Sequence, residues 1–185
     1  MNYDIIAICL VCVIVIFIEI KIKKNFIKPK SLPINYCIDL IECEINCMNG
    51  RDFEEFVSYV FSLLGNKVKL TPASRDGGVD IILNKTSYVE CKRYAEQNLI
   101  GTPIVYKLIG ACFCNNIKNA IIITTSGYTT DARAVAELIN HKDFKLQLWT
   151  KKELLDLCRK CDPNDLLQYL NYDVKELSRN LKNIS

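Results

Sequence analysis

The sequence predicts an α/β fold in which an antiparallel hairpin feeds a set of parallel strands, giving a mixed sheet flanked by helices. Two patterns indicate this fold. Short runs rich in β-branched residues alternate with longer amphipathic segments over residues 49–160, and Ala120–Thr125 is a continuous apolar run of the kind buried on both faces. The chain has 185 residues, of which 50% are hydrophobic, which suffices for one domain with an appendage and excludes wholesale disorder.

An unbroken apolar run, Ile5–Ile18, stands near the amino terminus and is followed by a lysine-rich stretch. The run is shorter than the roughly 20 residues that cross a bilayer core, so a buried or dimerising helix is the alternative. Because lysines follow the run and no basic segment precedes it, we predict a single-pass transmembrane anchor over residues 1–24, with the rest of the chain in the cytoplasm. Residues 25–48 are expected to form a linker and an amphipathic helix.

Two amphipathic helices open the globular part, over Asn35–Cys47 and Arg51–Leu64. In each, apolar side chains recur at intervals of three or four residues. The dipeptides Asn49-Gly50 and Gly65-Asn66 interrupt the pattern after each helix.

The remaining elements alternate between strands and helices. Pro103 lies near the start of the helix expected over Leu99–Ile117, and proline is tolerated in the first turn of a helix. The last expected helix belongs to a separate C-terminal segment, residues 161–185. The expected strands are Val68–Thr71, Val79–Leu83, Ser87–Lys92, Ala120–Thr125 and Lys145–Trp149, and the expected helices are Leu99–Ile117, Thr129–Asn140, Lys151–Cys161 and Pro163–Lys182.

Two acids and a lysine form the strongest candidate for a chemical site. Residues two apart on a strand face the same side, so Glu90 and Lys92 project together. If Asn84–Thr86 is a three-residue loop, Asp80 lies opposite Glu90 on that face. A divalent cation, Mg²⁺ or else Mn²⁺, held by Asp80 and Glu90 would explain why charges gather beside an apolar sheet. Lys92 could then orient or deprotonate an attacking water, or stabilise charge on a phosphate.

The same three residues are also consistent with a surface salt bridge on an edge hairpin. Their neighbours carry similar alternatives. Gly77 and Gly78 would let a substrate approach the backbone closely. Arg93 and Tyr94 follow the strand and either contact the backbone of DNA or merely end the strand. The pair Cys158-x-x-Cys161 has half the spacing of a zinc knuckle, a weak signal that buried thiols in a reducing cytosol explain equally well.

Four motifs in order resemble the Mrr-type, or type IV, restriction endonuclease domain, a branch of the PD-(D/E)xK nuclease superfamily. The likeness covers about residues 49–157. The motifs are G-R-D-F-E (Gly50–Glu54), D-G-G-V-D (Asp76–Asp80), E-C-K-R-Y (Glu90–Tyr94) and I-I-I-T-T-S (Ile121–Ser126).

The resemblance implies a restriction-endonuclease-like sheet and metal-dependent cleavage of DNA. It matches Asp80 and Glu90 to the metal-binding acids, Lys92 to the catalytic lysine, and Glu54 to a supporting acid on the first helix. The chain departs from the pattern at Val79, where the superfamily has proline, and at Glu90, where many relatives carry glutamine. Glutamate is the better metal ligand, so the second departure favours activity.

The function expected from these features is an endonuclease that hydrolyses phosphodiester bonds in double-stranded DNA during restriction of foreign or modified DNA. The net charge of +3 permits such an anionic partner without requiring one. Two alternatives stay open: a membrane-tethered DNA-binding module that does not cut, and a repair or junction nuclease of the same fold. Leucines in the closing helices suggest core packing or a homodimer.

Overall fold

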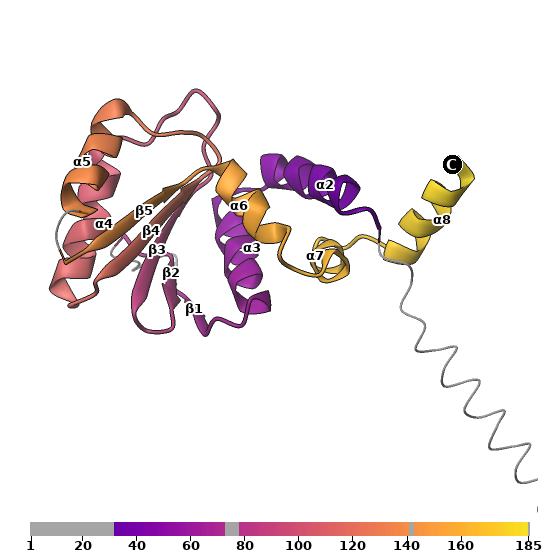
Figure 1. Cartoon of the computed structure of the whole chain (residues 1–185), viewed down its shortest axis with the longest axis horizontal. Helices are drawn as coiled ribbons and strands as arrows, with labels where there is room; N and C mark the ends of the chain where they lie inside the picture. Colours follow the sequence, from indigo (N-terminus) through magenta and orange to yellow (C-terminus); the bar gives the residue numbers. More distant parts are fainter. Residues whose placement is uncertain (1–31, 73–77, 141–142, 185) are drawn as a thin grey trace, which may run out of the picture.

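The computed structural model describes residues 32–72, 78–140 and 143–184, and a five-stranded sheet lies at its centre (Figure 1). The strands follow one another across the sheet in chain order, antiparallel from the first to the third and parallel from the third to the fifth. The expected mixed sheet is therefore confirmed. The strands are β1 (Val68–Leu70), β2 (Ile81–Leu83), β3 (Ser87–Lys92), β4 (Asn119–Thr124) and β5 (Lys145–Trp149).

Helices cover both faces of this sheet (Figure 1). On one face α4 packs on β3 and β4, and α5 packs on β5. On the other face α3 packs on β1 and β3 and α6 on β4 and β5, while α2 packs against α6 and α7. The helices are α2 (Ile34–Cys47), α3 (Gly50–Leu63), α4 (Thr102–Cys114), α5 (Thr130–Asn140), α6 (Lys151–Cys158), α7 (Pro163–Tyr169) and α8 (Val174–Ile184).

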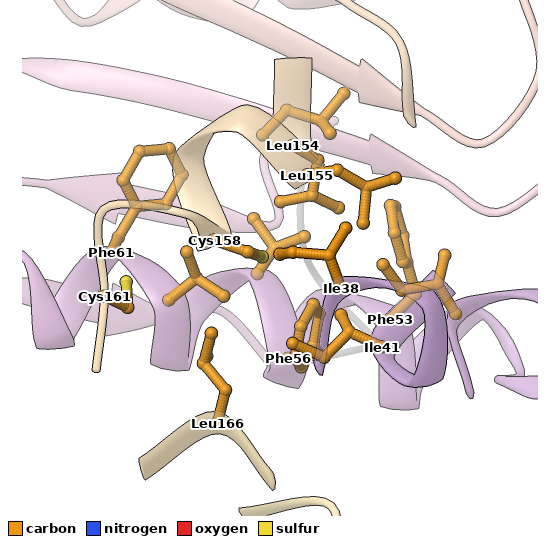
Figure 2. Packing of buried hydrophobic residues seen from close by; sticks show 14 of the residues in the cluster. Ile38, Ile41, Phe53, Phe56, Phe61, Leu154, Leu155, Cys158, Cys161 and Leu166 are labelled. Carbon is orange, nitrogen blue, oxygen red and sulfur yellow. The ribbon is translucent and has the colours of Figure 1, made fainter. Parts of the chain in front are cut away.

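The larger apolar core lies between the sheet and α3 (Figure 2). The stripe predicted on α3 supplies Phe53 and Phe56, both fully buried, and Asn49 caps this helix by accepting a hydrogen bond from the Asp52 amide at 2.9 Å. Each buried side chain of this size stabilises the fold by about 1.5–3 kcal/mol. This packing fixes α3 against β1 and β3, the strands beside the candidate site.

Several helix ends differ from the prediction, two of them at asparagines. α6 ends at Cys158 instead of Cys161, and α4 begins at Thr102 instead of Leu99. The stretch expected as one helix, Pro163–Lys182, is two, because Asn171 adopts φ +64° after α7. The Tyr172 amide then donates to the Leu167 carbonyl and the Asn171 amide to Gln168, a pairing that closes a helix. Asn116, at φ +53°, closes α4 in the same way. Helix α4 therefore ends at Cys114, three residues before the expected end at Ile117.

The hairpin between β2 and β3 has the predicted register. Leu83 pairs with Ser87, and the loop between them contains Asn84 and Lys85 at positive φ. Beyond the last ladder pair, the Asp80 amide donates to the Val89 carbonyl at 2.9 Å. Asp80 therefore faces Glu90 across the hairpin, as the three-residue loop requires.

The expected anchor, residues 1–24, lies outside the described residues, as do residues 25–31. Among the helices that the structure describes, none is both long and apolar enough to cross a membrane.

Candidate active site

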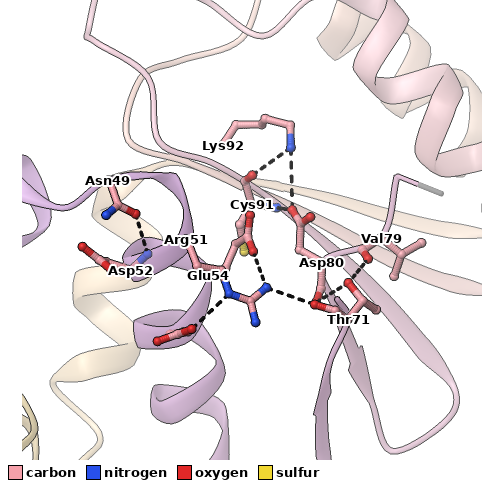
Figure 3. A network of polar contacts seen from close by, with 10 residues as sticks. Asn49, Arg51, Asp52, Glu54, Thr71, Val79, Asp80, Cys91 and Lys92 are labelled. Carbon is pink, nitrogen blue, oxygen red and sulfur yellow. Dashed lines mark hydrogen bonds and ion pairs between the residues drawn. The ribbon is translucent and has the colours of Figure 1, made fainter. Parts of the chain in front are cut away.

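Two buried carboxylates, Asp80 and Glu90, converge with Lys92 where β3 ends. Figure 3 shows Asp80 and Lys92 of this group. The Lys92 Nζ atom lies 2.6 Å from Glu90 Oε1 and 3.6 Å from Asp80 Oδ2. The side chains of Glu90 and Asp80 are only 1% and 3% exposed, whereas that of Lys92 is 22% exposed. Buried acids of this kind differ from a surface salt bridge, because removing one partner leaves an uncompensated charge in the core.

Backbone groups hold these side chains in place. The Cys91 amide donates to Asp80 Oδ2 at 2.7 Å, and Lys92 Nζ donates to the Cys91 carbonyl at 3.0 Å (Figure 3). Thr71, at the end of β1, donates through its hydroxyl to the Val79 carbonyl at 2.6 Å. The chain segment that carries Asp80 is therefore fixed on both sides before any ligand binds.

Burial and neighbouring charges shift the pKa values of Glu90 and Lys92. Burial raises the pKa of Glu90, and the nearby Asp80 carboxylate raises it further, although Lys92 opposes both effects. Burial by itself would lower the pKa of Lys92, but contact with Glu90 and the charge of Asp80 outweigh it, so the Lys92 pKa is raised. Lys92 is thus held as an ammonium between the acids.

A divalent cation fits this donor set. The Lys92–Glu90 contact is an ion pair without hydrogen-bond alignment, so neither buried Glu90 oxygen receives a hydrogen bond from the described part of the chain. Mg²⁺ typically binds one or two carboxylates and keeps several waters. Within the described ranges no group of three or more His, Cys, Asp or Glu side chains gathers for a metal, so a cation here would rely on Asp80, Glu90 and non-protein oxygens.

Glu54, the acid expected to support the metal, lies on α3 close to these residues (Figure 3). Its Oε2 atom accepts from Arg51 Nη1 at 3.1 Å, and its side chain is 18% exposed. Burial and the charge of Asp80 raise the Glu54 pKa, while Arg51 and Lys92 oppose the rise. The charges of Asp80 and Lys92 therefore act on Glu54, although Glu54 pairs with Arg51. A role of Glu54 in metal binding stays a prediction.

The sequence of this region matches a known family. Residues 45–158, more than half of the chain, fit the profile of the Mrr_cat family, described as restriction endonuclease. The chain belongs to the Mrr_cat family. The candidate site lies within the matched residues of this Mrr_cat domain.

Two curated relatives share part of the Mrr_cat domain. An uncharacterized protein of Sinorhizobium fredii, y4cE, is 30% identical over 119 residues, which are 60% of this chain and 30% of that protein. The type IV methyl-directed restriction enzyme EcoKMrr of Escherichia coli K12 is 39% identical over 70 residues, which are 35% of this chain and 22% of the enzyme. The chain thus spans less than a third of either relative.

Two solved structures share the fold of the Mrr_cat domain. The DNA modification-dependent restriction endonuclease AspBHI superposes with a TM-score of 0.53 at 21% identity, covering 77% of this chain and 40% of AspBHI. MspJI restriction endonuclease, solved in complex with a 27-mer oligonucleotide, superposes with a TM-score of 0.50 at 16% identity, covering 77% of this chain and 34% of MspJI. At these identities the likeness establishes the fold.

Lys107 of the Mrr_cat domain was not predicted as a site residue. Gly78 adopts φ +88°, and a Cβ atom there would lie 2.6–2.9 Å from three side-chain carbons of Lys107. The Lys107 side chain therefore lies directly over the backbone that leads into Asp80, and its charge acts to lower the pKa of Glu90. One signal was available: Lys107 is the only charged residue in the α4 sequence. Gly77, the other expected glycine contact, lies outside the described residues.

The two residues after β3 are bound within the fold. The Arg93 guanidinium donates to the Asn46 carbonyl at the end of α2. The Tyr94 amide donates to Thr125 Oγ1 at 2.9 Å, and the Thr125 hydroxyl donates to the Tyr94 carbonyl at 2.6 Å. These bonds tie the end of β3 to α2 and β4, and the contact of Arg93 favours a structural role at the end of the strand over contact with DNA. Direct contact of Tyr94 with DNA stays a prediction.

Cys158 and Cys161 of the Mrr_cat domain are free thiols packed in the larger core (Figure 2). Burial raises the pKa of Cys158 to about 12, and it also raises the pKa of Cys161. Metals bind the thiolate, so burial disfavours the form that a metal would need.

Proposed function

We propose that this chain is a divalent-cation-dependent endonuclease that hydrolyses phosphodiester bonds in double-stranded DNA, with Mg²⁺ as cofactor and Mn²⁺ as a substitute. One observation carries the proposal: Asp80, Glu90 and Lys92 converge in a chain of a restriction endonuclease family. The described functions of EcoKMrr and AspBHI, methyl-directed and modification-dependent restriction, support modified DNA as the substrate.

Each residue of the site has a distinct proposed task. Asp80 and Glu90 hold the cation, whose chemistry is to activate water and to neutralise charge on the phosphate. Lys92, charged because of its acidic neighbours, donates hydrogen bonds and so orients the water or a phosphate oxygen. The raised Lys92 pKa supports this role over proton abstraction, which needs a neutral amine. Lys107, which lies over Gly78, is placed to add a second positive charge near the reacting phosphate.

Plasmid cleavage by the full-length chain tests the proposal. The chain is incubated with methylated and unmethylated supercoiled plasmid in Mg²⁺, Mn²⁺ or EDTA. We expect nicking or linearisation with either cation, none with EDTA, and faster cleavage of the methylated plasmid. Lys92→Ala should slow cleavage by at least ~100-fold, since preorganised charged donors contribute on that order.

Controls separate chemistry from folding. Lys152→Ala removes an exposed lysine on α6 and should cut like the wild-type protein. Asp80→Asn keeps the shape of the side chain, removes a carboxylate proposed to hold the cation and should also be inactive, and the thermal unfolding of each variant verifies that it folds. Cation-independent cleavage, or full activity of Lys92→Ala, would overturn the proposal. DNA binding without cleavage under every condition would instead favour a binding module.

A further inference from the structure

A basic groove of about 470 Å³ lies over β1, β2, the hairpin loop and the start of β3, and none of the functions described above involves it. We call it the lysine groove. It is lined by Lys67, Val68, Lys69, Ile82, Lys85 and Tyr88.

The lysine groove shares a sheet face with the candidate site. On β3, Tyr88 lies two residues before Glu90 and four before Lys92, so all three side chains project to the same face. Lys69, Ile82 and Tyr88 pair with one another across β1, β2 and β3, so their side chains form one row across the sheet. This row is one side-chain repeat, roughly 7 Å, from the row of Asp80 and Glu90.

Helices cover this part of the face less than the rest of the sheet. The helices on this side, α4 and α5, pack mainly on β3, β4 and β5, and α3 packs on β1 from the opposite face. From Glu90 back to Thr86, where the hairpin loop begins, the chain covers about 14 Å at 3.4 Å per residue, the length of about four steps of B-form DNA. The path from the candidate site through the groove is therefore long enough to follow a stretch of DNA backbone.

Hydrogen bonds hold two of the three lysines beside one another. Asn84 Oδ1 accepts from the Lys67 amide at 2.9 Å, and the Asn84 amide donates to the Lys67 carbonyl at 2.8 Å. Asn84 Nδ2 also donates to Asn66 Oδ1 at 2.8 Å, and Lys85 follows directly. The hairpin loop is thus tied to the start of β1, and the ladder between β1 and β2 positions Lys69 beside it.

The charge of the groove is uncompensated. Lys67, Lys69 and Lys85 are exposed, and across the part of the chain that the structure describes none of them forms an ion pair. By contrast, Lys151 is paired with Glu42 at 2.9 Å. Three unpaired cations beside a half-buried tyrosine are complementary to phosphates, which lysine and tyrosine both contact in protein–DNA interfaces.

We propose that the lysine groove binds the sugar–phosphate backbone of double-stranded DNA on one side of the scissile phosphate. This inference rests on the proposed function, since it assigns the path by which DNA leaves the candidate site. The groove contributes affinity through its charges, without reading bases, because its lysines contact phosphates.

Salt dependence of binding tests the groove. The full-length chain is titrated with a fluorescent 30-base-pair duplex in EDTA at several salt concentrations, and the slope of log Kd against log salt is measured. Each neutralised phosphate contributes about 0.9 to this slope, so the triple variant Lys67→Gln, Lys69→Gln, Lys85→Gln should flatten it by about 2–3. The matched control, Lys152→Gln, Lys160→Gln, Lys175→Gln, removes three exposed charges from α6, α8 and the segment between helices α6 and α7, and should leave the slope unchanged.

Lysine footprinting on the wild-type chain provides a test without mutation. Bound DNA should slow acetylation of Lys67, Lys69 and Lys85, while Lys152 and Lys160 stay as reactive as in the free protein. An unchanged slope in the groove variant, or unprotected groove lysines, would overturn the inference even if the plasmid is cut. A flattened slope in a chain that cuts no plasmid would support the groove while the nuclease proposal fails.

A different anionic surface is tested in parallel. The same variants are incubated with vesicles containing phosphatidylserine. Loss of vesicle binding by the groove variant, with DNA binding intact, would overturn the inference in favour of a lipid surface.

Discussion

At the scale of single residues, Glu90 is the most deeply buried side chain of the site, and its protonation equilibrium is shifted. Its pKa is raised, chiefly by burial, so the folded chain binds this proton more tightly than the unfolded chain does. Without a cation, the resulting stability is present below the ordinary pKa of glutamate and is lost as pH rises through the raised value. A bound cation would reverse this preference, because it favours the ionised carboxylate.

We therefore expect Mg²⁺ to bind more weakly as pH falls toward the raised Glu90 pKa, because proton and cation compete for the same oxygens. Calorimetric titration of the full-length chain from pH 8 to pH 5 measures this. Glu90→Gln should bind Mg²⁺ more weakly at pH 8 and lose most of the pH dependence. Wild-type affinity that is constant over this range would contradict the prediction.

Gly78 and Gly65 form a matched pair for testing the contact with Lys107. Both adopt positive φ, at +88° and +82°, but a Cβ at Gly65 would meet open space whereas one at Gly78 would meet Lys107. We expect Gly65→Ala to lower the free energy of unfolding by about 1 kcal/mol, the cost of positive φ for alanine, and Gly78→Ala to cost more.

Urea unfolding measures both costs. In the Gly78→Ala, Lys107→Ala double variant the flexible side chain is gone, so the cost of the alanine relative to Lys107→Ala should approach that of Gly65→Ala. Equal costs for the two single glycine variants would show that Lys107 does not confine the backbone beside Asp80.

At the scale of elements, the end of β3 is joined to α2 and α6. Arg93 donates to the Asn46 carbonyl, and Lys151 at the start of α6 donates to Asn46 Oδ1 at 3.1 Å. Lys151 also pairs with Glu42 of α2. Helix α2, most of which precedes the matched family region, is thereby fastened to the strand that carries Glu90 and Lys92.

This contact predicts a structural effect of Arg93. Arg93→Ala should lower the free energy of unfolding by about 1–3 kcal/mol, as expected for a hydrogen bond from a charged donor. The salt slope of DNA binding should stay unchanged. A slope flattened by about 1 would instead reveal a phosphate contact and contradict the prediction. Arg159→Ala serves as the control, because that side chain is 42% exposed and its stability cost should stay within ~0.5 kcal/mol.

Local signals predicted most of the elements. The alternation in Ser87–Lys92 and Lys145–Trp149 marked both strands at their observed ends, since side-chain period is a property of the local sequence. The early ends of α4 and α7 were not predicted. Left-handed asparagines close both helices, and asparagine tolerates that conformation without requiring it.

At the scale of the whole molecule, the expected anchor makes a prediction about location. The apolar run Ile5–Ile18 and the lysines after it favour insertion with the folded domain in the cytoplasm. After cell fractionation, the full chain should sediment with membranes and be released by detergent but not by high salt. A chain without residues 1–24 should move to the soluble fraction, and a full-length chain found there would contradict the anchor.

The sequence alone determined the order of the strands, the hairpin register and the meeting of Asp80, Glu90 and Lys92. Each follows from side-chain period or turn length, which act within a few residues. The tertiary structure alone decided the partners of Arg93 and Glu54, the position of Lys107 over Gly78, and the lysine groove. Most of these contacts join elements far apart in sequence. The pairing of Glu54 with Arg51 lies within one helix, but the sequence did not decide whether Glu54 pairs with Arg51 or supports a metal. Their geometry depends on how helices pack on the sheet, which no local pattern specifies.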